Sequence, residues 1–229
     1  MRWVARLVGS SIGMKALMAL TGVILVGFLV GHMIGNWQIF AGQDTLNAYG
    51  AFLHARPGAL WAVRIGLLGT LLIHIGTSVR LTRLNKAARP IGYRVNKAPK
   101  STLASRHMML SGSAVFAFLV YHLLHFTVRV TDPVFNVLTD AQGRHDVYSM
   151  VVLSFRNNAV ALTYVIAMVL LGFHLSHAIS SMFQSMGLHG QSRLVERIGP
   201  IVATILVVGN IVMPLAVQFS FINLPPGAP

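Results

Sequence analysis

Cysteine is absent from the 229 residues, which excludes disulfides, thiolate-bound iron–sulfur clusters and haem attached through a C-x-x-C-H motif. Charge is also scarce, because 10% of the residues are charged, whereas about 25% is typical of soluble domains. Only 5 residues are Asp or Glu, against 18 Lys or Arg. A metal cofactor bound by this chain must therefore be held mainly by its 10 histidines.

Long apolar runs are abundant, and hydrophobic residues make up 55% of the chain. Five runs reach the ~20 residues that a helix needs to cross a bilayer. We therefore predict an all-α membrane protein with a single domain, residues 1–229, and no sequence repeat. The first run is too long for a signal peptide, so we interpret it as an uncleaved span. The five transmembrane helices are expected at about residues 14–40, 58–81, 103–130, 159–186 and 199–221.

The basic residues predict the topology. The amino end, the 80–106 connection and the 187–198 turn carry 13 of the 18 Lys and Arg residues. Positive residues gather on the cytoplasmic side, so we expect the amino end to be cytoplasmic and the carboxyl end outside. This topology accounts for the net charge of +13, and we expect no nucleic-acid partner. The 80–106 connection is also suited to binding anionic lipid or a partner subunit.

Four spans each contain at least one histidine, and an ionisable side chain inside a membrane span is costly enough to indicate function. With 1.5 Å of rise per residue, His32 and His122 lie ~25 Å from the cytoplasmic starts of their helices. His74 and His174 lie ~14 Å and ~18 Å from the cytoplasmic ends of theirs. Each level thus receives a histidine from two helices. Two axial imidazoles suit a low-spin b haem that carries electrons, so we predict two haem b groups within the first four helices.

Two further histidines and a row of glycines have open interpretations. His125 and His177 each follow a candidate ligand by three residues, and depth alone does not exclude them as ligands. They are also suited to bonding a haem propionate or a backbone carbonyl, or to lining a quinone pocket. Gly27, Gly31 and Gly35 share one helix face, which permits close approach by another helix or by a flat macrocycle.

The chain resembles the dihaem cytochrome b subunit of the succinate dehydrogenase and fumarate reductase family over nearly its whole length. The family pattern has five spans, an amino end inside, and histidines only in the first four. Four segments of this chain carry the resemblance: Ser111-Gly112 followed ten residues later by His122, His174 followed thirteen residues later by Gly187, LLIHI around His74, and VGHMIGNW around His32.

The resemblance implies an inner haem between His74 and His174 and an outer haem between His32 and His122. It also implies partners on the cytoplasmic face, namely a flavoprotein with covalent FAD and an iron–sulfur subunit. The chain would then belong to an enzyme, a succinate:quinone oxidoreductase of the bacterial inner membrane, whose succinate site lies in another chain. The implied quinone is a menaquinone.

One position departs from the family pattern. Some fumarate-reducing members carry a buried glutamate two residues before the helix IV ligand, where this chain has Gly172. The departure favours succinate oxidation with quinone reduction, and a quinol:fumarate reductase working in reverse is the alternative. The outer quinone site is expected after the first span, with five candidate residues: Asn36, Trp37, Asp44, His54 and Arg56.

Three other functions compete with this hypothesis. A dihaem b anchor of a hydrogenase or formate dehydrogenase would show a similar spectrum. A histidine-lined metal or proton transporter would explain the buried histidines, but it does not require paired depths and usually retains carboxylates in its spans. A haem-free anchor would leave the paired histidines without a role.

Overall fold

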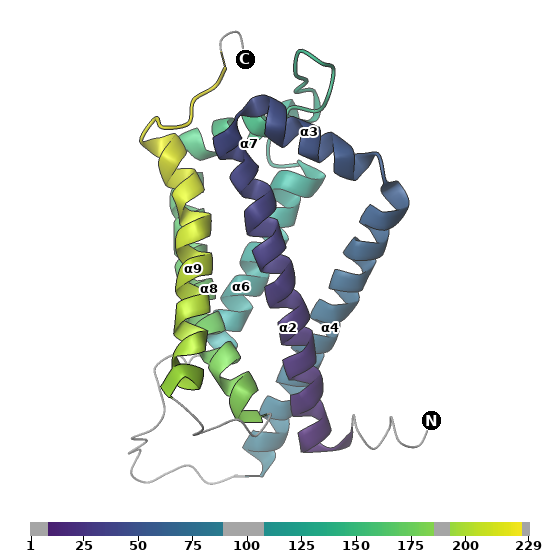
Figure 1. Cartoon of the computed structure of the whole chain (residues 1–229). Helices are drawn as coiled ribbons and strands as arrows, with labels where there is room; N and C mark the ends of the chain where they lie inside the picture. Colours follow the sequence, from purple (N-terminus) through teal and green to yellow (C-terminus); the bar gives the residue numbers. More distant parts are fainter. Residues whose placement is uncertain (1–8, 89–107, 186–192, 226–229) are drawn as a thin grey trace.

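The computed structural model describes residues 9–88, 108–185 and 193–225. Five long helices run side by side along the molecule (Figure 1), and no β-strand is present in the described residues. These helices are α2 (Ser11–Asn36), α4 (Pro57–Ala87), α6 (Met108–His122), α8 (Asn158–Ser185) and α9 (Arg193–Gln218).

Each of these helices, α6 only together with the π-helix that continues it, includes a segment long and apolar enough to cross a membrane, which confirms the predicted all-α membrane fold with five spans. Two of them are extended at their carboxyl ends, α2 by the 3₁₀ helix η1 (Trp37–Ala41) and α6 by the π-helix η2 (Leu123–Val128). The predicted bounds were wrong for α9, which begins six residues earlier and encloses Pro200, and for α4, which ends six residues later at Ala87. The predicted residues 103–107 and 186 lie outside the described residues.

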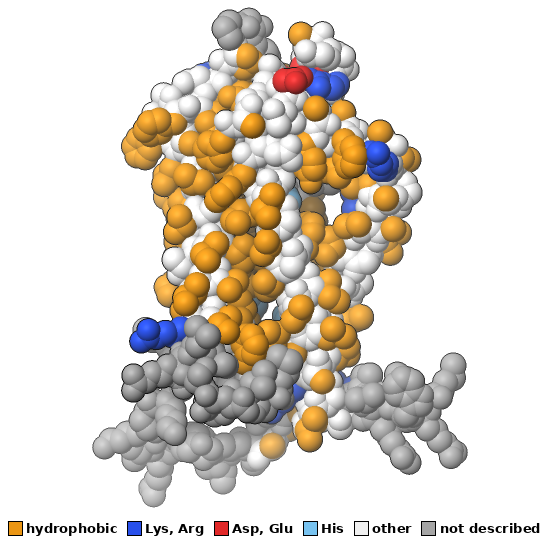
Figure 2. Space-filling model, in the orientation of Figure 1, with side chains coloured by type: hydrophobic (Ala, Val, Ile, Leu, Met, Phe, Trp, Pro, Cys, Tyr) orange, Lys and Arg blue, Asp and Glu red, His pale blue; other side chains and the backbone are white. Residues whose placement is uncertain are grey.

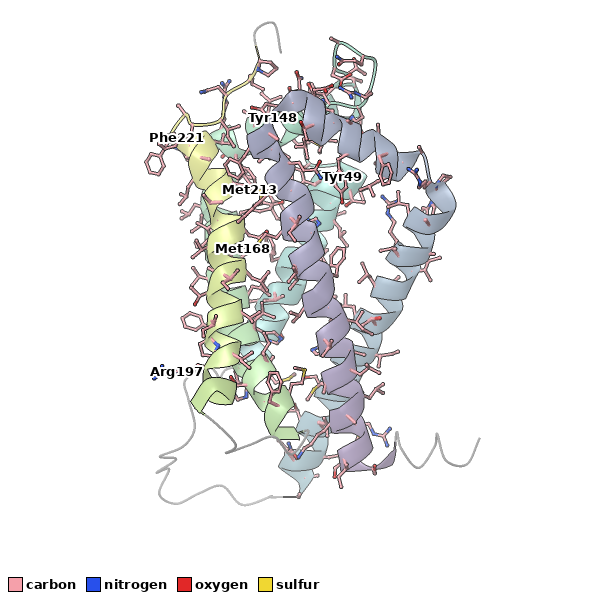
Figure 3. All side chains as sticks on the ribbon, viewed as in Figure 1. Tyr49, Tyr148, Met168, Arg197, Met213 and Phe221 are labelled. Atoms are coloured by element: carbon pink, nitrogen blue, oxygen red, sulfur yellow. The ribbon has the colours of Figure 1, made fainter. Side chains whose placement is uncertain are left out.

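Three shorter elements lie at the upper end of Figure 1. They are α3 (Gln43–His54), η3 (Pro133–Asn136) and α7 (Val147–Arg156). The sequence indicated only polar connections there. Helix α7 forms because Asp146 caps it, accepting a hydrogen bond from the Ser149 backbone N–H. Its apolar side chains then pack in the core at the upper end of the bundle, where Figure 3 labels Tyr148.

The two ends of the bundle differ in charge. Every described aspartate lies at the upper end, near the red surface in Figure 2. The lower end carries described basic side chains and no described carboxylate, and Figure 3 marks Arg197 there. The lower basic residues are Lys15, Arg80, Arg83, Lys86 and Arg197.

Helices α8 and α9 form the most tightly packed pair. A Cβ atom on Gly172 of α8 would lie 2.6 Å from Cγ2 of Val207 on α9, and one on Gly199 would lie 2.5 Å from the Ser176 carbonyl oxygen. Such distances exclude any larger side chain without movement of the helices. The position that departs from the family pattern, Gly172, is therefore a close helix contact.

Helix α4 is the most loosely packed. It meets α2 near its lower end, where Thr77 and Leu81 are buried, and the two helices diverge toward α3 (Figure 1). None of the residues in its most apolar window is buried. This divergence opens the side of the bundle where the candidate ligands lie.

Candidate functional site

His32 and His122 face each other at the upper level of the bundle. Their ring centroids lie 5.8 Å apart and their planes are nearly perpendicular, at 89°. A histidine nitrogen binds a first-row metal at about 2 Å, so two imidazoles on opposite sides of one metal have centroids roughly 6 Å apart. The observed separation matches this value, and the two donors come from different helices, α2 and α6.

Tyr164 of α8 connects His122 to His125. Its hydroxyl oxygen lies 3.3 Å from Nδ1 of His122 and 2.9 Å from Nδ1 of His125. A hydroxyl has one proton, so it can donate to one of these nitrogens while it accepts from the other. Because the Nδ1 atoms of both histidines contact Tyr164, a metal at this level would bind Nε2 of His122.

At the lower level, a threonine sets the tautomer of His74. Thr21 on α2 uses its only hydroxyl proton within its own helix, where its oxygen lies 2.9 Å from the Leu17 carbonyl oxygen. The same oxygen lies 3.1 Å from Nδ1 of His74. Since that proton is already used, Thr21 must accept, and His74 must donate from Nδ1–H. The lone pair of the neutral imidazole is then on Nε2, where a metal can bind.

The same arrangement recurs around His174. The hydroxyl of Ser111 on α6 donates to the Met108 carbonyl oxygen at 3.1 Å, and its oxygen lies 3.4 Å from Nδ1 of His174. Donation by Nδ1–H again leaves Nε2 of His174 available. His74 contacts Thr21 and His174 contacts Ser111, and these two hydroxyl residues each lie 11 positions before the facing His32 and His122, so the two rings lie at about the same depth in the bundle.

The two halves of the site share one short motif. Thr21-Gly22 precedes His32 on α2 as Ser111-Gly112 precedes His122 on α6, and both intervals from hydroxyl to histidine are 11 residues. At 1.5 Å per residue, the two levels are therefore ~16 Å apart along both helices. Gly22 and Gly112 bring their helices against the rings of His74 and His174 respectively.

There is space beside these histidines for a flat ligand. A Cβ atom added to Gly27 or Gly31 would meet no heavy atom within 4 Å, whereas one on Gly35 would lie 3.0 Å from the Tyr49 ring. Of the predicted glycine face, only Gly35 thus contacts another helix in the described residues. Figure 2 shows the surface hollowed between α2 and the upper part of α4. The four histidine donors fit two haem groups, and the open space beside Gly27 and Gly31 suits a flat ligand at the upper level.

The other histidine candidates have different surroundings. His125 is buried, with 3% of its surface exposed, and bonds Tyr164 rather than facing His32. His177 is half-buried on α8, about one turn beyond His174. Within the part of the chain that the structure describes, no three His, Cys, Asp or Glu side chains converge as the ligands of a single metal ion.

The five predicted quinone-site residues do not form one cluster. Asp44 pairs with Arg144 at 2.7 Å, whereas His54 at the end of α3 and Arg56 just before α4 contact backbone carbonyl oxygens of α3. Trp37 donates from its indole N–H to the Gly209 carbonyl oxygen at 2.7 Å and so ties α2 to α9. Asn36 is half-buried at the end of α2.

Sequence reasoning missed a buried polar network between α3 and the segment before α7. Asn47 is fully buried, and its amide donates to Asp140 and Asp146 at 3.1 and 2.9 Å. Its carbonyl oxygen accepts from the Tyr148 backbone N–H at 3.0 Å. Burial raises the pKa of Asp140, but hydrogen bonds from Arg144 and Asn47 outweigh it and hold that pKa below its usual value. The network locks the upper end of the bundle.

Tyr164 was also missed. The only available signal was a phenol within an otherwise apolar run, and nothing local connects it to histidines 39 and 42 residues earlier.

Comparison with protein-family models, with curated proteins and with solved structures found no match for this chain.

Proposed function

We propose that this chain is the dihaem cytochrome b membrane anchor of a succinate:quinone oxidoreductase, carrying electrons from an iron–sulfur subunit to a membrane quinone. The observation that supports it most is the arrangement of four histidines from four helices as two pairs, ~16 Å apart along the bundle. The resemblance to the succinate dehydrogenase and fumarate reductase family supplies the identity of the enzyme.

The four ligands would be used through Nε2. His32 and His122 would hold the upper haem, and His74 and His174 the lower one. When bound, each haem would supply a one-electron carrier rather than a substrate site. The chain's own contribution is to fix the imidazoles, since Thr21, Ser111 and Tyr164 accept the Nδ1–H bonds that orient the rings.

The basic lower end is the proposed docking face for the flavoprotein and iron–sulfur subunits. By the positive-inside rule it faces the cytoplasm of a bacterial cell, which places the lower haem nearer those subunits and the upper one nearer the outside. Succinate oxidation would release two electrons and two protons in the soluble part. The two electrons and two protons from water would convert the quinone, a menaquinone in this proposal, to its quinol.

Gly172 bears on the direction of turnover. Its close contact with Val207 leaves no room for the glutamate found in some fumarate-reducing relatives. This supports succinate oxidation over the reverse reaction. The metal or proton transporter is less well supported, because the described parts of the five spans contain no carboxylate and no cluster of three ligands.

The test is the reduced-minus-oxidised spectrum and the haem-to-protein ratio of the purified complex. We expect a low-spin b-type spectrum and two haems per chain. His32→Ala and His122→Ala should each remove the same haem, and His74→Ala and His174→Ala the other. His54→Ala, at an exposed residue of α3, is the control and should retain both. A haem-free wild-type complex would overturn the proposal, and copurifying hydrogenase or formate dehydrogenase subunits would assign the anchor to a different enzyme.

A further inference from the structure

Two cavities follow each other along the seam between α6 and α8, and the proposed haem ligands line neither. The upper one, of about 260 Å³, opens where α7 meets α8. Its lining includes buried His125 together with exposed Asp132 and Asn157. It therefore runs from the interior of the bundle to the surface and changes from buried to accessible polar groups along the way.

The second cavity is an apolar groove of about 300 Å³. Alanines 114 and 117 of α6 form one wall, and Ala167 and Leu170 of α8 form the other. Tyr121 lines both cavities, so the groove continues the polar cavity along the same seam. A ligand that fills both must have a compact polar head and an apolar tail.

We propose that this seam binds an isoprenoid quinone, with its headgroup in the upper cavity and its tail in the groove. The proposal rests on the function proposed above and locates the quinone on that function's electron path. An engineered cavity of about 150 Å³ holds benzene, so the larger upper cavity has room for a quinone ring. The tail would lie on the outer surface of the bundle, where Ala117 is exposed.

The polar groups of the upper cavity suit the two oxygens of a quinone. The side-chain carbonyl oxygen of Asn157 caps α8, accepting from the Ala159 backbone N–H at 3.0 Å. This leaves the side-chain NH₂ group of Asn157 free to donate to a quinone carbonyl. His125 uses Nδ1 for Tyr164, so its remaining N–H can be the second donor. Asp132 can accept from the hydroxyl of the quinol product.

The cavity is connected to the upper candidate ligand through one side chain. His125 lines the cavity, Tyr164 bonds His125, and Tyr164 also lies 3.3 Å from His122. A quinone there would lie next to the upper haem position. It would take up the two electrons released by succinate, together with two protons from water at the exposed mouth, and leave as the quinol. This site lies at the predicted end of the bundle but uses residues other than the five predicted ones.

The experiment uses the purified complex, reconstituted with menaquinone in lipid nanodiscs. Ala117→Trp fills the groove from its exposed wall. Asn157→Ser keeps a helix-capping side chain but removes the amide donor. Leu162→Trp, at an exposed position of α8 outside both cavities, is the matched control. The readouts are quinone extracted per chain, the dissociation constant of a short-chain naphthoquinone, and the haem content of each variant.

We expect Ala117→Trp and Asn157→Ser to keep two haems and to bind the naphthoquinone about tenfold more weakly, which is roughly 1.4 kcal/mol. The control should bind like the wild type. Wild-type affinity for the naphthoquinone in both variants would show that the seam is not the quinone site. The same conclusion would follow if Ala117→Trp lost a bound phospholipid but kept its quinone. Neither outcome would affect the dihaem proposal. A wild-type complex without haem would instead overturn the dihaem proposal, whatever its quinone content.

Discussion

The hydroxyl oxygen of Thr21 lies 3.1 Å from Nδ1 of His74, while its proton is directed to the backbone of its own helix. The helix thereby presents a hydrogen-bond acceptor to the histidine ring and leaves Nε2 free. An imidazole that donates its Nδ1–H to an acceptor becomes a more basic ligand at Nε2, which favours the oxidised state of a bound iron.

Thr21→Val should remove this acceptor while keeping the shape of the side chain. We expect the lower haem to remain bound and its midpoint potential to rise. The rise is about 59 mV for each tenfold loss in the stability of the ferric form relative to the ferrous form. Redox titration followed by the haem spectrum measures the change. Thr70→Val, whose hydroxyl bonds the Gly66 carbonyl oxygen of its own helix, should leave both potentials unchanged; an equal shift there would contradict a specific role for Thr21.

Gly112 and Gly22 provide a matched pair of alanine substitutions. A Cβ atom on Gly112 would lie 3.2 Å from Cε1 of His174, whereas one on Gly22 would lie 3.7 Å from Cε1 of His74. We expect Gly112→Ala to displace the His174 ring and to reduce occupancy of the lower haem severalfold. Gly22→Ala should be close to neutral, because 3.7 Å is an ordinary contact. Haem per chain, from the absorbance of the reduced complex, tests both, and the reverse order would contradict the geometry.

Tyr164→Phe should affect the upper level alone. It removes the hydroxyl shared by His122 and His125 and leaves their Nδ1 atoms without that partner, at a loss of about 1–3 kcal/mol of unfolding free energy. We expect two haems, an altered spectrum and potential for the upper one, and a lower melting temperature. Tyr148→Phe, which removes a hydroxyl that donates to the Asn223 carbonyl oxygen at 3.0 Å, is the control and should leave the spectrum and potential of both haems unchanged. A change in the lower haem would show that Tyr164 acts through the fold instead of through His122.

The existence and approximate position of the spans could be predicted because apolar length is a local property that tertiary contacts rarely override, but their ends were missed by up to six residues where polar helical turns continue α4 and precede α9. Helices α3 and α7 could not, because each mixes polar and apolar residues and is helical only by lying across the bundle end. The pairing of His32 with His122 follows from depth, but the role of Tyr164 depends on how α8 is rotated, which hydropathy does not encode. The Thr21-Gly22 and Ser111-Gly112 motifs were visible in the sequence, yet their meaning depends on which histidine each faces.

Asn47 is expected to be the most sensitive position outside the histidine levels. Asn47→Leu removes two hydrogen bonds to buried carboxylates, Asp140 and Asp146. Because hydrogen bonds to charged groups contribute ~1.5–3 kcal/mol each, we expect a loss of about 3 kcal/mol or more of unfolding free energy. The melting temperature of the purified complex measures it. Asn158→Leu, at an exposed position, should change it little, and similar losses in both variants would contradict the role of the network.

His145 should make the upper end of the bundle sensitive to acid. Its Nε2 lies 2.8 Å from Arg129 Nη1 and accepts a hydrogen bond from it, while its Nδ1–H donates to the Leu138 carbonyl oxygen at 3.2 Å. Burial, and secondarily the charge of Arg129, lowers the pKa of His145 below 6.5. Between 6.5 and that lower value, the unfolded chain binds a proton that the folded chain does not.

Stability should therefore fall as the pH drops through 6.5 and level off below the folded-state pKa of His145. His145→Gln, which keeps a hydrogen-bonding side chain without a titrating proton, should flatten this part of the profile of melting temperature against pH. An unchanged slope in His145→Gln would mean that another group titrates in this range and that the Arg129–His145 contact does not set the acid sensitivity.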